Sequence, residues 1–313
     1  MKFGAVLWSQ SSDWKGFLDA ARRADQLGYD SIWTWDHLYA IFGDPDQQLI
    51  EGYTALAGLA MATDRARLGL LVGAITFRNP GVVAKAMVTI DHMSGGRSIV
   101  GLGGAWFGLE HEAFGIDFGT GPGQRLDWLD EATGAIRALL DGDHVTSPEN
   151  GRYRFRDLHL NPLPLQDHLP IMIGGSGEKK TLRTVARYAD QWNAFGSATV
   201  LARKDQILQR HCEEVGRDHR LIERTVGGKV VLRKTESEAQ RVLVDLMNHN
   251  RTPMSDLEGD DTFWAESPAQ LVERLLGYKE IGFDTLLVEM PAPYDRETME
   301  ALISEVKPVV SRS

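Results

Sequence analysis

Short apolar runs and longer amphipathic stretches alternate along the whole chain. The short runs are almost continuously apolar, which is typical of strands in a parallel sheet that is covered on both faces. The longer stretches repeat apolar residues at helical spacing. This pattern predicts eight strands, at residues 3–8, 31–35, 68–74, 98–102, 171–174, 191–194, 228–232 and 285–289.

The helices between these strands carry recognisable boundary signals. Asp13 stands at the N-cap position of a helix over residues 14–27, and Gly28 ends that helix. Near the other end of the chain, Ser267 and Gln270 have the spacing of a capping box. The same reasoning predicts further helices at residues 53–62, 80–93, 122–141 and 236–248.

Strands that are mostly followed by helices imply an α/β fold, a parallel sheet closed into a (β/α)8 TIM barrel. We expect a single domain over residues 1–313. The competing open, doubly wound sheet lacks its Gly-x-Gly-x-x-Gly fingerprint after the first strand. Two segments depart from the alternation. Residues 142–169 are predicted to be an insertion, and the polar residues 249–266, with Phe263 and Trp264, are predicted to be a lid over the substrate.

Active residues of such barrels gather at the carboxyl ends of the strands. There this chain places glycine, alanine and aromatic residues with few charges, which suits a large planar ring. A metal site would need several His and carboxylate ligands converging from different strands, and we expect none. The candidate ring-binding residues are Gly73, Ala74, Ile75, Gly103, Gly104, Ala105 and Trp106.

A glycine-rich turn after the fifth strand is the candidate anchor for a phosphate. The turn opens directly into a predicted helix, and free backbone N–H groups at the start of a helix bind phosphate well. Hydroxyl groups in the turn add hydrogen-bond donors. The candidate residues are Gly174, Gly175, Ser176, Gly177 and Thr181.

Asp36 and His37, after the second strand, are the candidate catalytic residues. His37 shares strand parity with Trp33 and Trp35, so these three side chains are predicted to project to one face. An imidazole passes protons near neutral pH, as hydride or oxygen chemistry on a flavin-type ring requires. The alternative is a histidine that only satisfies a loop carbonyl.

Five segments, in the same order along the chain, resemble the luciferase-like monooxygenase family. They are residues 67–115, SIWTWDH at 31–37, PIMIGGSGEKKTL at 170–182, ADQWN at 189–193, and residues 267–289, which end in GFDTLLVE. The resemblance implies that His37 lies beside the reactive carbon of a flavin-type ring and that the cofactor phosphate binds after the fifth strand. It also implies a non-prolyl cis peptide at Gly73-Ala74-Ile75, pressed against the middle ring, and a homodimer.

Two reactions compete within this family. With the deazaflavin coenzyme F420, the enzyme would move a hydride to or from a small organic substrate. With reduced FMN, it would insert one oxygen atom, and a separate reductase would supply the reduced cofactor. Asp36-His37 and the string ITFRNP at 75–80 look more like the deazaflavin branch, so we expect F420, with FMN as the alternative. Sugar-phosphate dehydrogenases of that branch carry a glutamate proton donor where Trp106 stands here, which argues against a sugar-phosphate substrate.

Composition narrows the other function classes. The net charge of −10 disfavours nucleic acid as a partner, and no apolar run reaches the roughly 18 residues of a membrane span. The lone Cys212 and the absence of a secretory signal fit a cytoplasmic enzyme. Outside redox catalysis, two alternative hypotheses are a Schiff-base aldolase that uses Lys234 and a flavin-binding protein without turnover.

Overall fold

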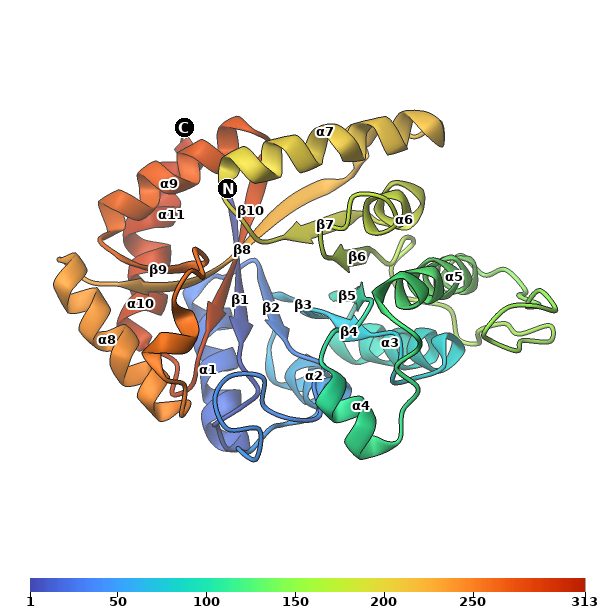
Figure 1. The fold of residues 1–313 in the computed structure, drawn as a ribbon, viewed down its shortest axis with the longest axis horizontal. Coiled ribbons are helices and arrows are strands. Elements are labelled where there is room, and N and C mark those ends of the chain that lie inside the picture. The colour runs from blue at the N-terminus through green and yellow to red at the C-terminus, as the bar shows by residue number, and fades with distance from the viewer. Residues whose placement is uncertain (313) are drawn as a thin grey trace.

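Parallel strands form the centre of the protein and helices surround them (Figure 1). The structure, a computed structural model, describes residues 1–312. The strands within these residues are β1 (Lys2–Leu7), β2 (Ser31–Thr34), β3 (Arg67–Leu70), β4 (Gly73–Ala74), β5 (Ser98–Gly103), β6 (Ile171–Gly174), β7 (Gln191–Ala194), β8 (Glu223–Leu232), β9 (Phe263–Glu266) and β10 (Phe283–Met290).

The α-helices within the same residues are α1 (Trp14–Leu27), α2 (Gly52–Ala62), α3 (Pro80–Ser94), α4 (Gly108–Phe114), α5 (Pro122–Leu140), α6 (Thr181–Tyr188), α7 (Ala198–Glu214), α8 (Glu236–His249), α9 (Pro268–Glu280), α10 (Arg296–Ala301) and α11 (Lys307–Arg312). The predicted caps are confirmed. The Asp13 side chain accepts from the Gly16 N–H, Gly28 ends α1 with a φ of 92°, and the Ser267–Gln270 capping box opens α9.

The barrel closes through β1, β2, β3, β5, β6, β7, β8 and β10, and all neighbouring strands are parallel. β10 pairs with β1 on one side and with the first half of β8 on the other, where Lys229 lies opposite Glu289. The predicted (β/α)8 barrel is therefore confirmed. The carboxyl ends of these strands meet at one mouth, which is where active sites of such barrels lie.

Alternate strand residues face the helices and the barrel interior. In β1, Phe3 packs in the layer beneath the helices, whereas Val6 and the following Trp8 belong to the interior cluster. Trp33 and Trp35 belong to the same interior cluster, as their parity predicted. These large aromatic rings fill the middle of the barrel.

The predicted third strand, residues 68–74, is interrupted in the structure. β3 ends at Leu70, β4 consists of Gly73 and Ala74, and the peptide bond between Leu71 and Val72 is cis. The expected non-prolyl cis bond is therefore present, but it precedes Gly73. Its assignment to Gly73-Ala74-Ile75 was wrong.

Two irregular segments depart from the βα alternation. The predicted insertion at 142–169 contains an antiparallel bridge between Val145 and Leu158 and is otherwise without strand or helix. The polar segment at 249–266 ends in β9, which pairs with the last four residues of β8. Residues 263–266 are thus part of the sheet, and closure of the preceding residues over a substrate stays a prediction. Across residues 1–312, no helix has both the length and the apolar character that crossing a bilayer requires.

Candidate active site

A cavity of about 540 Å³ opens at the barrel mouth, within the size range of small-molecule and cofactor sites. Most of the predicted site residues line it, namely Asp36, His37, Ala74, Gly103, Gly104, Ala105, Trp106, Gly174, Gly175 and Thr181. Four others lie outside its lining. Gly73 and Ile75 face a small void beneath α3 and α5, and Ser176 and Gly177 continue the turn beyond the cavity wall. The barrel thus brings together residues from four separate parts of the chain.

His37 lies at the edge of the cavity and is held by a buried carboxylate. Its Nδ1 is 3.0 Å and 3.2 Å from the two carboxylate oxygens of Glu110, on helix α4, and Glu110 is only 1% exposed. The backbone N–H of Leu38 also donates to Glu110, at 2.9 Å. Because a carboxylate accepts hydrogen bonds, it places the hydrogen of neutral His37 on Nδ1 and leaves Nε2 free to accept a proton.

Asp36 is buried beneath the cavity and makes different contacts. Its carboxylate accepts hydrogen bonds from Arg78 Nη1 at 2.8 and 3.0 Å and from the backbone N–H of Ala74 at 2.9 Å. Burial raises the pKa of the Asp36 carboxyl, and the Arg78 guanidinium counters part of that rise. The hydrogen bonds from Arg78 and from the Ala74 N–H tie Asp36 to the end of β4, and Asp36 also contributes to the cavity lining; its catalytic role stays a prediction.

Glycines surround Val72 at the floor of the cavity. A Cβ atom at Gly103 would lie 2.4 Å from Val72 Cγ2, and a Cβ at Gly174 would lie 2.9 Å from Val72 Cγ1. The side-chain-poor ends of β5 and β6 therefore accommodate the Val72 side chain first. Val72, Gly103 and Gly174 all line the cavity, where together they form a surface without polar side chains. Such a surface fits a planar ring.

The glycine turn after β6 leads into helix α6, as predicted. Gly175 has a φ of 117°, and its N–H donates to the carbonyl of Asn193 at 3.0 Å. Thr181, the first residue of α6, is buried and lines the cavity. The nearby Lys180 ammonium is bound to Asp127 at 2.7 Å and lies outside the cavity lining. A phosphate here would therefore rely on the backbone N–H groups and the helix start, as the sequence indicated.

A second charged group lines the cavity from the opposite side. Lys229 of β8 is 8% exposed, donates to Thr262 Oγ1 at 2.8 Å, and lies 3.5 Å from Asp260 and 3.9 Å from Glu289. The rings of Phe42, Phe195 and Phe263 surround its ammonium at 4.6–5.6 Å. Burial raises the pKa of Glu289, and Lys229 counters part of that rise.

Sequence reasoning did not single out Glu110 or Lys229. Lys229 had a visible signal, because a lysine interrupts an otherwise apolar strand at GGKVVL. Glu110 had none, since it lies in a helix of seven residues that follows no long apolar pattern. The predicted Trp106 is 62% exposed at the rim, with its ring centroid 5.8 Å from that of His37.

The match to known families covers most of the chain. Residues 1–285 match the family model of the luciferase-like monooxygenases. The chain belongs to this family. Its members include both F420-dependent and FMN-dependent oxidoreductases and monooxygenases, so the luciferase-like chain is an enzyme of that kind.

Relatives of this luciferase-like chain fall into both cofactor classes. An F420-dependent glucose-6-phosphate dehydrogenase of Intrasporangium calvum is 26% identical, with 97% of this chain and 98% of that protein covered. An FMNH2-dependent dimethylsulfone monooxygenase of Pseudomonas putida is 25% identical, with 85% and 80% covered. Among solved structures, an F420-dependent secondary alcohol dehydrogenase in complex with an F420–acetone adduct superposes with a TM-score of 0.83 at 20% identity, covering 99% of this chain and 98% of that one. That structural likeness supports the fold.

Proposed function

We propose that this enzyme uses coenzyme F420 to transfer a hydride to or from a small organic substrate. The observation that carries the proposal is the His37–Glu110 pair at the edge of a cavity whose floor is poor in side chains. Reduction of a carbonyl, or oxidation of an alcohol, moves a proton as well as a hydride. The pair supplies a group of suitable chemistry for that proton.

The residues present fit a tricyclic cofactor. Val72, Gly103 and Gly174 provide an uncharged floor, and Gly175 and Thr181 lie at the start of α6, where an anionic tail gains from the helix N-terminus. We propose these residues, together with Ala74, Gly104, Ala105 and Trp106, as the cofactor-binding residues. When bound, F420 would supply a ring carbon that accepts or gives a hydride.

His37 carries the proton in this proposal. Glu110 keeps the hydrogen of neutral His37 on Nδ1, so that Nε2 takes the hydroxyl proton of an alcohol substrate. In the opposite direction, the protonated imidazole donates from Nε2 to a carbonyl oxygen. The Glu110 carboxylate continues to accept from Nδ1–H when the ring is protonated.

The decisive experiment is a parallel fluorescence titration of the purified enzyme with F420 and with FMN. We expect saturable binding of F420 and much weaker binding of FMN, and the reverse result would overturn the proposal. His37→Ala should keep the fold and F420 binding while turnover falls by about 10²–10⁴, the usual contribution of a general acid–base. Near-normal rates in this variant would exclude the role of His37.

The second candidate is a monooxygenase that uses reduced FMN from a separate reductase, favoured by the similarity to the Pseudomonas enzyme over 85% of this chain. Preferential FMN binding together with oxygen consumption in the presence of a reductase would select it. A protein that binds the cofactor without any substrate-dependent oxidation would be the non-catalytic alternative. The homodimer and the cytoplasmic location stay predictions.

A further inference from the structure

A pair of histidines lies across the antiparallel bridge of the insertion, outside the residues that line the cavity. Val145 N–H donates to Leu158 O at 2.8 Å, and Leu158 N–H donates to Val145 O at 2.9 Å. The residues that flank such a doubly bonded pair face each other without backbone hydrogen bonds, and their side chains come closest. His144 and His159 occupy these positions, and their rings stack with centroids 4.3 Å apart.

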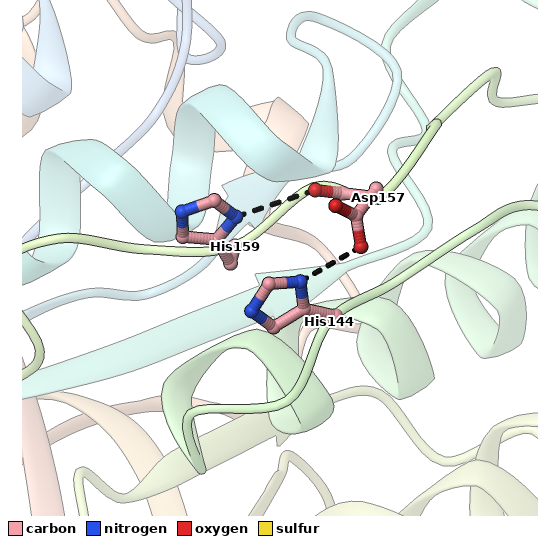
Figure 2. A group of neighbouring side chains, drawn as sticks. All are labelled: His144, Asp157 and His159. Carbon is pink, nitrogen blue, oxygen red and sulfur yellow. Dashed lines mark hydrogen bonds and ion pairs between the residues drawn. The ribbon is translucent and has the colours of Figure 1, made fainter.

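Asp157 brings a carboxylate to the same point. It adopts a left-handed backbone conformation with a φ of 50°, and its N–H donates to Thr146 Oγ1 at 3.0 Å. His144 Nδ1 lies 2.7 Å from the Asp157 carboxylate, and His159 Nδ1 lies 3.3 Å from the Asp157 carbonyl. Both rings therefore turn Nδ1 toward Asp157, as Figure 2 shows.

We propose that His144, Asp157 and His159 form a binding site for a divalent transition-metal ion, with Zn²⁺ as the preferred ion. Two imidazoles and one carboxylate are ligands that Zn²⁺ favours. One ligand atom from each residue already lies within 4.8 Å of the other two. Water would complete a tetrahedral set, because the site is open to solvent.

The adjustment that binding requires is small. Metal–ligand bonds of about 2.0–2.2 Å in a tetrahedron place the ligand atoms roughly 3.3 Å apart. Because every separation is within 4.8 Å, none must shrink by more than about 1.5 Å. One imidazole must also leave the stack, because a cation has to lie in the plane of each ring. All three side chains are exposed, so they can rotate without disturbing the core.

The bound ion would cross-link the two ends of the loop at 146–156. It would replace the protons that now join His144 and His159 to Asp157, so it would restrain the insertion without changing its path. None of the three residues lines the cavity. The site is thus independent of the F420 proposal, and its failure would leave that proposal intact.

The test uses the full-length enzyme with any purification tag removed and residual metal stripped by chelation. Calorimetric titration with ZnCl2 should show one saturable site per chain. His144→Ala and His159→Ala should each weaken binding at least tenfold, which corresponds to about 1.4 kcal/mol. Asp157→Asn should also weaken it, and asparagine tolerates the left-handed conformation at this position. Turnover should stay at the wild-type level in all three variants.

A matched control is His168→Ala. His168 Nε2 lies 2.8 Å from Asp190, and its side chain is 56% exposed, so this pair resembles His144–Asp157 without a second imidazole. Binding that persists in His168→Ala but is lost in His144→Ala and His159→Ala would support the site. If the wild-type enzyme shows no saturable binding, or if His144→Ala binds Zn²⁺ as tightly as the wild type, the proposal is overturned. Hydrogen exchange at the Val145 and Leu158 amides should slow on addition of Zn²⁺, and unchanged exchange would contradict the cross-link.

Discussion

Replacing Glu110 by glutamine tests the arrangement on which the proton chemistry of His37 depends. The substitution keeps the size of the side chain and removes its charge. One amide oxygen can still accept from either Leu38 N–H or His37 Nδ1–H, but the amide nitrogen only donates. If the oxygen stays with Leu38, the amide N–H faces His37 Nδ1. The neutral imidazole must then accept at Nδ1 and carry its hydrogen on Nε2.

The expected loss of stability follows from the two short hydrogen bonds that the Glu110 carboxylate accepts. The carboxylate accepts from His37 Nδ1 at 3.0 Å and from Leu38 N at 2.9 Å while almost fully buried. Hydrogen bonds to a charged group contribute about 1.5–3 kcal/mol each and those between neutral groups about 0.5–1.5 kcal/mol, so the neutral glutamine keeps both contacts at roughly half their strength. We therefore expect Glu110→Gln to lower the free energy of unfolding by about 2 kcal/mol. We also expect loss of the proton-accepting role of Nε2.

Two measurements check this expectation. Urea denaturation gives the change in stability, and the nitrogen-15 chemical shifts of the His37 ring report which nitrogen carries the hydrogen. Glu112→Gln is the control, because Glu112 lies exposed on the same short helix and should change neither quantity. If Glu110→Gln is as stable as the wild type and His37 keeps its hydrogen on Nδ1, the assignment of the tautomer to Glu110 is refuted.

Three further substitutions test the cavity floor, a buried carboxylate away from the cavity lining, and the Lys229–Glu289 pair. Gly103→Ala should lower the free energy of unfolding by about 1–3 kcal/mol, because its Cβ would contact Val72. Adding Val72→Ala to the same chain should recover most of this stability in thermal melting. Equal melting temperatures of the single and double variants would contradict this explanation. Burial alone would raise the pKa of Asp25, but the N–H groups of Asp64, Ala66 and Arg65 outweigh it and lower that pKa below 3.8. The ionised Asp25 carboxylate therefore contributes its full stabilisation above about pH 4, and this contribution is lost as the pH falls further. The difference in urea stability between the wild type and Asp25→Asn should accordingly narrow below about pH 4. A difference that stays constant with pH would be inconsistent with the lowered pKa. Lys229→Met should raise the pKa of Glu289 further in a carbon-13 titration, whereas the exposed Lys234→Met should leave it unchanged.

The barrel could be predicted from the sequence because the signals of its strands and helices are local. Apolar runs located the strands that close the barrel, and capping residues such as Asp13 and Ser267 fixed the starts of helices. Strand β9 was not predicted because its four residues, Phe263–Glu266, follow an acidic stretch that is typical of a loop. The strand exists because it pairs with the end of β8, and such a partner is not encoded in local periodicity.

Only the site residues at the ends of strands could be predicted from the sequence. Glycines and His37 at those ends lie in the cavity because parallel strands deliver their carboxyl ends to one mouth. Glu110 is different, since it reaches His37 across 73 residues and from a helix too short to predict. Ile75 follows β4 directly and is buried in the core cluster rather than in the cavity lining, so its contact with a cofactor stays a prediction.

The adjacent residues Asp36 and His37 join the end of β4 to helix α4, in addition to the pairing of β4 with β5 and the contact of Thr76 Oγ1 with His111 Nε2 at 2.8 Å. Asp36 is tied to the Ala74 N–H and to Arg78, and so fixes the end of β4 that follows Val72. His37 is tied through Glu110 to helix α4, beyond the glycines of β5. A shift of the floor by movement of β4 therefore carries His37 with it, because one peptide unit separates the two attachments. This coupling gives the buried Asp36 carboxylate a structural role beside His37. It also means that Asp36→Asn should disturb the placement of His37 as well as the packing around Arg78.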